Sequence, residues 1–184
     1  MVNENIGFGV ICWPNIFTYN TIIDGLCKAG LIEKARELFL EMKGFGISLD
    51  TVTYTTLIHG FCCVGDWKKG TSLFIEMMDQ DVRPSVVSFN VLIDERCKKR
   101  KLDEANRLLE LMIQRGVDPT VYTYNIFMNG LCKIGEISPT IKLLEEMAKG
   151  NEESGVICRP NVVSYSTVID GLCKVGLVKK AINL

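Results

Sequence analysis

The sequence has little of what several common protein classes require. Its 21 lysine and arginine residues are matched by 22 aspartate and glutamate residues, so the net charge of −1 creates no overall positive field for a nucleic acid. Apolar runs are interrupted by polar residues or glycine long before the roughly 18–20 residues that a membrane-spanning helix needs. Membrane insertion is therefore not expected, and any nucleic-acid partner would have to meet locally concentrated basic residues.

The chain contains a single histidine, His59. Eight cysteines are present, but there is no signal peptide and no Cys-x-x-Cys spacing, so they predict neither a disulfide framework nor a zinc site. A catalytic triad would need His59, and there is no glycine-rich loop of the kind that cradles phosphates. We therefore expect a reducing compartment, no metal, no cofactor and no enzymatic activity.

The sequence does contain one motif that recurs along the chain. Tyr19–Gly30 reads YNTIIDGLCKAG, Tyr124–Gly135 reads YNIFMNGLCKIG and Tyr165–Gly176 reads YSTVIDGLCKVG, with weaker copies at 54–65 and 89–100. Successive copies begin 35, 35, 35 and 41 residues apart. This spacing is typical of solenoids built from helical hairpins.

The chain accordingly divides into repeat units, in which Ile16 is position 1 of the first. Residues 1–15 match 147–161 in length and ending and read as the end of a preceding repeat, so we expect a segment of a longer array. The complete units are 16–50, 51–85, 86–120 and 121–161, the last with an extended loop, and 162–184 is a partial unit.

Each unit is predicted to form two helices, at about positions 3–14 and 18–30. Gly30, Gly65, Gly135 and Gly176 stand where the first helix should end in a left-handed residue. The second helix is expected to start at an N-cap such as Asp103 or Ser138, and prolines near the unit boundaries stop it. The predicted fold is an all-α solenoid of stacked helix-turn-helix hairpins.

Two stripes run along the first helix of each unit. Positions 4, 7, 8 and 11 are apolar and are predicted to be core; in the first unit they are Tyr19, Ile22, Ile23 and Leu26. Positions 2, 5, 9 and 13 lie on another side and carry an apolar residue, a small amide or hydroxyl, a polar residue and usually a lysine. We call the four residues at these positions of one unit a rung. Rungs repeated along the stack suit a linear polymer, because the apolar residue could cover a base, the amide or hydroxyl could bond the base edge, and the lysine could neutralise a phosphate. The alternative is an ordinary solvated helix face.

These residues resemble the pentatricopeptide repeat family, in its plain 35-residue P class. The pattern is matched nearly letter for letter at Tyr19–Gly30 and Tyr165–Gly176, and the resemblance covers the whole chain. The cysteine-rich first helices and the extended loop before Pro160 also resemble plant fertility-restorer-like members. The resemblance implies a right-handed superhelix that binds single-stranded RNA sequence-specifically, one base per repeat, in mitochondria or, as the alternative, chloroplasts. No targeting peptide is visible in this chain.

In the family, positions 5 and 35 select the base. Carried over to this chain, the pairs are Asn20 with Asp50 for uracil, Thr55 with Ser85 for a purine, with adenine favoured over guanine, Asn90 with Thr120 for either pyrimidine, and Asn125 with Asn161 for cytosine. Asn161 is aligned across six extra residues, and Ser166 is a half-pair that hints at another purine. The implied site therefore reads U, purine, pyrimidine, C from 5′ to 3′.

The resemblance also implies residues that sandwich the bases and residues that face the RNA backbone. The sandwiching positions are Phe17, Val52, Val87, Tyr122 and Val163, and the backbone-facing lysines are Lys28, Lys98, Lys133 and Lys174. The second unit departs from the pattern with Cys63 in place of the lysine, and the third replaces both glycines with Glu95 and Arg100.

A protein-binding helical-repeat scaffold is the alternative function, favoured by the near-neutral charge and the positive mean hydropathy of +0.18. Under either function, protein partners would supply any catalysis. Apolar faces on the end units would favour self-association.

Overall fold

The computed structural model describes residues 15–149 and 158–183, and every regular element in this part of the chain is an α-helix. The helices are α1 (Ile16–Lys28), α2 (Ile32–Gly44), α3 (Thr51–Cys63), α4 (Trp67–Asp79), α5 (Val86–Lys98), α6 (Leu102–Gln114), α7 (Val121–Ile134), α8 (Ile137–Lys149), α9 (Val162–Lys174) and α10 (Val178–Ile182). None of these helices is long and apolar enough to cross a bilayer. Residues 1–14, predicted to end a preceding repeat, lie outside the described residues.

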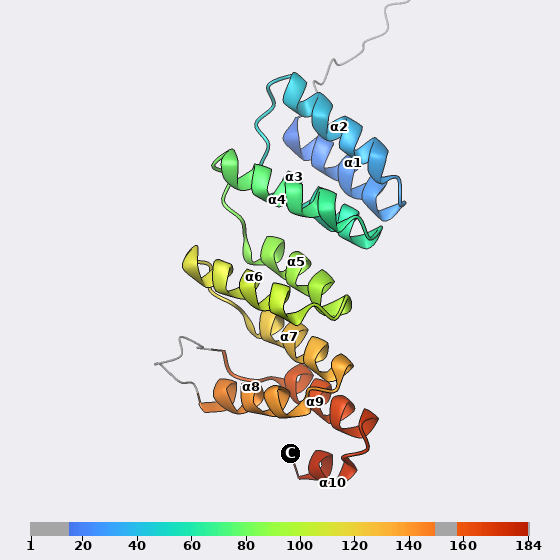
Figure 1. The fold of residues 1–184 in the computed structure, drawn as a ribbon. Coiled ribbons are helices and arrows are strands. Elements are labelled where there is room, and N and C mark those ends of the chain that lie inside the picture. The colour runs from blue at the N-terminus through green and yellow to red at the C-terminus, as the bar shows by residue number, and fades with distance from the viewer. Residues whose placement is uncertain (1–14, 150–157, 184) are drawn as a thin grey trace, which may run out of the picture.

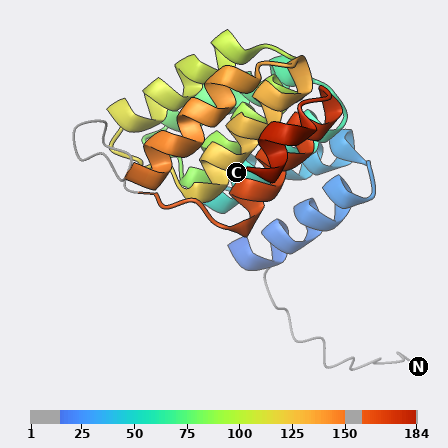
Figure 2. The same ribbon diagram turned by 90° about the horizontal axis from the view of Figure 1, so that it is seen from below.

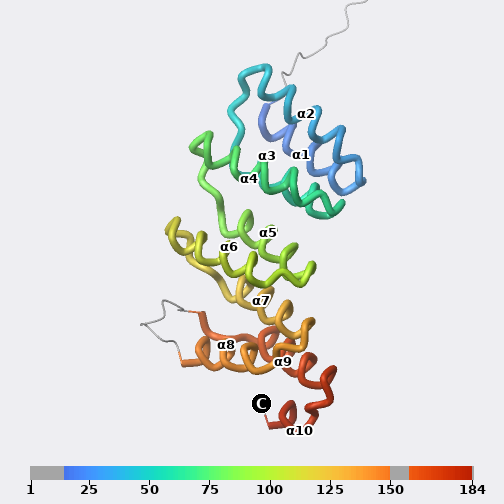
Figure 3. Tube along the Cα trace, in the orientation of Figure 1, coloured from blue at the N-terminus to red at the C-terminus, as the bar shows by residue number. Residues whose placement is uncertain are grey.

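The helices form hairpins that stack in chain order from α1–α2 at one end to α9–α10 at the other (Figure 1). The Cα trace advances along the stack without returning (Figure 3), and a view along the stack shows successive hairpins lying over one another (Figure 2). Each first helix packs against the first helices before and after it, and each second helix packs against the next first helix. The predicted all-α solenoid is confirmed, and α1, α3, α5, α7 and α9 form one continuous layer.

Polar N-caps determine where the first helices begin. Asn15, Asp50, Ser85, Thr120 and Asn161 each accept a hydrogen bond from the backbone N–H three residues further on. These helices therefore start at position 1 of the unit, two residues earlier than predicted, because position 35 of the preceding unit is the cap.

The predicted N-caps of the second helices were wrong. Helix α6 is preceded by Lys101, whose side chain makes no capping bond, so Asp103 lies inside the first turn. Ser138 likewise lies inside the first turn of α8. An acidic residue is favoured throughout the first turn by the helix dipole, so its presence did not identify the exact start.

The first helices end as expected at left-handed residues. Gly30, Gly65, Gly135 and Gly176 all have φ between 74° and 85°. In the third unit the same place is taken by Arg100, at φ 59°. A side chain in this conformation costs energy that glycine avoids.

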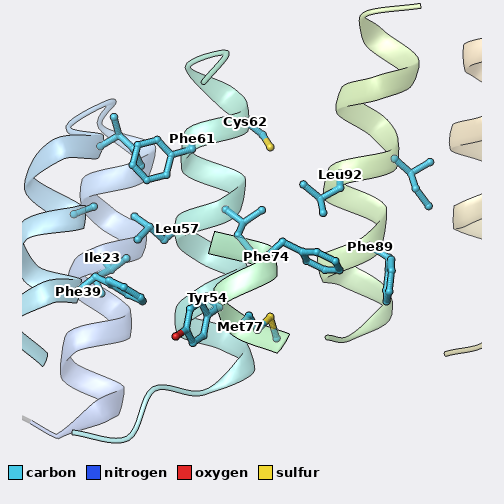
Figure 4. Packing of buried hydrophobic residues seen from close by; sticks show 14 of the residues in the cluster. Ile23, Phe39, Tyr54, Leu57, Phe61, Cys62, Phe74, Met77, Phe89 and Leu92 are labelled. Carbon is cyan, nitrogen blue, oxygen red and sulfur yellow. The ribbon is translucent and has the colours of Figure 1, made fainter. Parts of the chain in front are cut away.

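The core lies between successive hairpins (Figure 4). Phe39 packs edge-on against Tyr54 with ring centroids 5.3 Å apart, and Phe74 packs in the same way against Phe89 at 5.1 Å. The aromatic residues therefore join one unit to the next.

The apolar stripe divides into two sides. Ile23, at position 8 of the first unit, is fully buried, whereas Ile22, at position 7, is 47% exposed, so its assignment to the core was wrong. The last unit shows the reverse, with Val168 at position 7 buried and Ile169 at position 8 exposed by 38%. Position 7 therefore packs toward the preceding unit and position 8 toward the following one.

First helices approach one another closely where a glycine at position 10 faces a cysteine at position 12 of the preceding unit. Gly60 faces Cys27, and Gly130 faces Cys97. Burial raises the pKa of the Cys27 thiol to about 11 and that of Cys97 to about 12. These cysteines are neutral packing residues, as predicted from their position in the repeat.

Candidate nucleic-acid interface

A groove of about 590 Å³ crosses the layer of first helices from α1 through α3 and α5 to α7. Its walls include residues at positions 2, 5 and 13 of several units, namely Lys28, Thr55, Val87, Asn90, Lys98 and Tyr122. Side chains that lie up to 98 positions apart in the sequence, from Asp24 to Tyr122, therefore share one surface. The stack places the repeated stripes beside one another, as a binding surface for a linear polymer requires.

The apolar residue at position 2 of each unit is more than half exposed. The five side chains range from 56% to 76%, and they are Phe17, Val52, Val87, Tyr122 and Val163. They are free to cover a flat apolar surface, because no neighbouring helix covers them.

The side chain at position 5 lies deeper. Asn90 is only 5% exposed and Asn125 only 8%, whereas Asn20 and Thr55 are half-buried and Ser166 is exposed. An ordinary solvated helix face would not bury two asparagines, so burial counts against that alternative in the third and fourth units. Buried amides require hydrogen-bond partners, and these partners decide which of their atoms remain available.

Position 35 lies next to position 5 in space because it caps the following first helix. Asn20 Nδ2 donates to Asp50 Oδ1 at 3.3 Å, across 30 residues of sequence. Partial burial raises the pKa of Asp50, but hydrogen bonds from the Thr53 backbone, the Thr53 hydroxyl and Asn20 lower it more, so its net pKa lies below the ordinary value. Asp50 is therefore an ionised carboxylate at neutral pH, and it can only accept hydrogen bonds.

The lysines at position 13 are mostly paired with an aspartate one helical turn earlier. The Lys28–Asp24, Lys98–Asp94 and Lys174–Asp170 pairs each measure 2.6 Å from Nζ to a carboxylate oxygen. In the fourth unit the residue at position 9 is Asn129, and Lys133 forms no ion pair among the described residues. The second unit instead has Cys63 Sγ 3.4 Å from His59 Nε2. Positions 9 and 13 together are therefore close to neutral in the part of the chain that the structure describes, with Lys133 on α7 as the one unpaired cation; the lysines that line the groove are Lys28 and Lys98.

The hydroxyl at position 3 was not predicted to be part of the site. Thr53, Ser88, Thr123 and Ser164 are fully buried, and each bonds to the N-cap that precedes it. The signal was available, because position 3 is serine or threonine in every unit, including Thr18. Its role was hidden because the position-5 residue that it can contact belongs to the preceding unit.

A cluster of charged and aromatic side chains between the second and third units was also not predicted. The Arg96 guanidinium stacks on the Trp67 ring at 3.3 Å from its centroid and binds Glu104 at 3.1 Å, while Glu95 Oε1 is buried without a hydrogen-bond partner. Within residues 15–149 and 158–183, no three His, Cys, Asp or Glu side chains are placed to hold a metal ion.

Stacked helical hairpins with a repeated apolar, polar and basic rung on one helix layer define the class of α-solenoid binding proteins. The family model described as "PPR repeat family" matches residues 14–63, 49–95 and 84–133, and two models described as "PPR repeat" match 122–151 and 157–184. The chain belongs to the pentatricopeptide repeat family.

Curated relatives are pentatricopeptide repeat-containing proteins of Arabidopsis thaliana. One is 52% identical over 33 residues, which are 18% of this chain and 4% of the relative. Another, named as mitochondrial, is 57% identical over 35 residues, which are 19% of this chain and 8% of the relative. The aligned segments are about one repeat long and represent less than a tenth of either relative.

Solved structures of the family share the fold. The maize pentatricopeptide repeat protein PPR10 is 24% identical, with a TM-score of 0.76 over 93% of this chain and 24% of its own, and it has also been solved in complex with an 18-nt psaJ RNA element. The PPR domain of Arabidopsis thaliana protein-only RNase P 1, solved in complex with tRNA, is 18% identical, with a TM-score of 0.66 over 89% of this chain and 84% of its own. At these identities the likeness concerns the fold.

Proposed function

We propose that this chain binds single-stranded RNA sequence-specifically, with one base for each of the units 16–50, 51–85, 86–120 and 121–161. The observation that carries the proposal is the repeated set of an exposed apolar side chain, an amide or hydroxyl and a polar or basic residue on the stacked first helices. The groove contains this set in full from the third unit, as Val87, Asn90 and Lys98, and in part from the first, second and fourth units. Bases could stack on the first, form edge hydrogen bonds with the second and place their phosphates near the third. The protein acts as a binder, and partners supply any cleavage or other processing.

The pairs at positions 5 and 35 support a site of U, purine, pyrimidine, C. Relatives named as mitochondrial support a role in organellar RNA processing, stability or translation, with the mitochondrion as the location and the chloroplast as the alternative. Solved family members in complex with RNA support the choice of ligand. Fertility restoration and self-association remain predictions, the latter supported by the exposed Ile22 and Ile169 at the two ends of the stack.

The test is fluorescence anisotropy of the purified chain with short single-stranded RNAs that contain U-A-U-C, U-A-C-C or a scrambled order, across a salt series. Stacking of roughly 1–3 kcal/mol per base over four units, less the cost of ordering the RNA, predicts weak binding. Contacts of the lysines with phosphates should make this binding salt-sensitive. The first two RNAs should bind more tightly than the third, and Asn125→Thr should remove the preference for C at the last base. Asn106→Thr, on the exposed surface of α6, is the matched control and should leave the preference intact.

Equal binding of all three RNAs would refute sequence-specific binding. No binding even at low salt would favour the protein-binding scaffold. A pull-down of protein partners with the unaltered chain as bait would then be the next measurement.

The charge of the rungs makes a separate prediction. Asp94→Asn should free Lys98 from its 2.6 Å ion pair and strengthen RNA binding at low salt by about fivefold, the value of about 1 kcal/mol for one charge pair at 4 Å in water. Asn129→Asp should weaken binding by a similar factor, because it would give Lys133 the same partner. The slope of log affinity against log salt should become steeper by about 0.7 in the first variant and shallower in the second.

Asp103→Asn is the control for this prediction, because it removes the same charge from the exposed surface of α6. If it changes affinity as much as Asp94→Asn does, overall charge and not the groove governs binding.

A further inference from the structure

The hydroxyl of Thr53 connects the two residues proposed to read the first base. Its Oγ1 lies 2.7 Å from Asn20 Oδ1 and 2.8 Å from Asp50 Oδ1. The backbone N–H of Thr53 also donates to Asp50 Oδ1, at 2.8 Å. One buried residue on α3 therefore holds a side chain of α1 and the cap of its own helix together.

This contact determines which atoms of the pair remain available. Asn20 Nδ2 donates to Asp50 Oδ1, and Asn20 Oδ1 faces the Thr53 hydroxyl, so the amide has one orientation. One N–H of Asn20 and the Oδ2 of Asp50 have no side-chain hydrogen bond within the pair. A donor beside an acceptor is complementary to the edge of uracil, which presents a carbonyl oxygen beside an N–H.

The fourth unit repeats the arrangement with a different result. Ser164 Oγ donates to Asn125 Oδ1 at 2.7 Å and also lies 3.2 Å from Asn161 Oδ1. The Ser164 backbone N–H donates to the same Asn161 oxygen at 3.1 Å. Both amide oxygens are turned toward position 3, so both amino groups are left to donate. Two donors are complementary to the ring nitrogen and carbonyl oxygen of cytosine.

The second unit shows a related contact and the third shows the exception. Ser88 Oγ lies 2.6 Å from Thr55 Oγ1 and 3.1 Å from Ser85 Oγ, so a hydroxyl again joins positions 5 and 35. Thr123 contacts its N-cap Thr120, at 3.3 Å between hydroxyl oxygens, while Asn90 Oδ1 is buried with no hydrogen-bond partner. The amide of the third unit therefore lacks the donor that orients it in the first and the fourth.

We propose that the serine or threonine at position 3 is a positioning residue for base selection: its hydroxyl orients the position-5 side chain of the preceding unit and thereby determines whether the pair presents donors or acceptors to the base. The inference rests on the proposed RNA-binding function and adds a third member to the base-reading pairs of the first, second and fourth units. Thr53 acts in this way on Asn20, Ser88 on Thr55 and Ser164 on Asn125. The third unit, in which Asn90 has no such contact, should discriminate least between U and C.

The test compares the affinities of RNAs with U or C at the first base, measured by anisotropy with the whole chain. The unaltered protein should prefer U by about tenfold, the discrimination expected of one bidentate contact. Thr53→Val keeps the shape of the side chain but removes its hydroxyl, so the preference should fall below threefold. Thr53→Ser restores the donor and should restore the preference.

Thr123→Val is the matched control. Thr123 is as buried as Thr53, occupies the same position of its helix and contacts its N-cap, but it makes no hydrogen bond with Asn90. Its replacement should leave the U-to-C ratio at the third base unchanged. Circular dichroism confirms that each variant is folded, and if Thr53→Val does not fold, Ser164→Ala gives the same test through the C-to-U ratio at the fourth base.

A merely structural role for the hydroxyl would lower the affinity of Thr53→Val for both RNAs by the same factor. An unchanged ratio in that variant, beside a clear preference in the unaltered protein, would overturn the positioning role alone. Absence of any preference in the unaltered protein would instead overturn the proposed function and this inference with it.

Discussion

Replacing Gly130 with alanine is expected to lower the free energy of unfolding by up to about 2 kcal/mol, which is the usual overpacking cost of about 1–3 kcal/mol less the gain of about 1 kcal/mol that alanine brings to a helix. A Cβ at this position would lie 2.8 Å from Cys97 Cβ and 2.9 Å from Cys97 Sγ. Because the Cys97 Cβ is attached directly to the backbone of α5, relief requires movement of one helix against the next.

Gly25→Ala is the matched control, because Gly25 occupies the same position of the first unit and an added Cβ would meet no atom within 4 Å. This variant should raise the free energy of unfolding by about 0.5–1 kcal/mol. Urea unfolding followed by circular dichroism measures both. Shifts of the same sign in the two variants would show that helix propensity, and not the close contact between first helices, governs the position.

Exchanging Asn161 for aspartate is expected to change the preferred base of the fourth unit from C to U. The amide of Asn161 can donate, whereas a carboxylate only accepts and so suits the N–H of uracil. Aspartate caps a helix as well as asparagine does, and Asp50 already does so before α3, so the fold should be unchanged. With about 1–3 kcal/mol for a good base contact, a preference for C of about fivefold or more should become a preference for U of about fivefold or more.

Anisotropy with U-A-U-C and U-A-U-U RNAs measures the reversal for Asn161→Asp. Asn106→Asp adds the same charge on the exposed surface of α6 and should weaken both complexes equally. If Asn161→Asp also weakens both complexes equally, position 35 contributes charge and not base selection.

Much of the fold could be predicted from the repeat alone. Paired helices in a solenoid were predicted from the 3.6-residue periodicity, the glycines at the helix C-termini and the recurring motif, and the structure confirms them. The errors arose where several local choices were equivalent, as at the starts of α6 and α8, where any acidic or hydroxyl residue of the first turn satisfied the same rule.

The candidate site was predicted in part. The stripe of positions 2, 5, 9 and 13 could be read from helix geometry, and several of its members do line one groove. The burial of Asn90 and Asn125 could not be read in this way, because it depends on how the neighbouring helices pack against α5 and α7. The same reason hid the role of Thr53 and Ser164.

The sequence by itself determined the hairpin, its left-handed ends and the order of residue types on each rung, because these depend on interactions among residues within about one or two helical turns. Only the tertiary structure decided that Ile22 is exposed while Ile23 is buried, that Gly130 meets Cys97, and that the amide oxygens of Asn20 and Asn125 accept hydrogen bonds from the next unit. The hydrogen bonds to these amides join residues 33 and 39 positions apart, and their geometry depends on how one hairpin is set against the next. That setting results from the packing of whole helix faces, which no local pattern specifies.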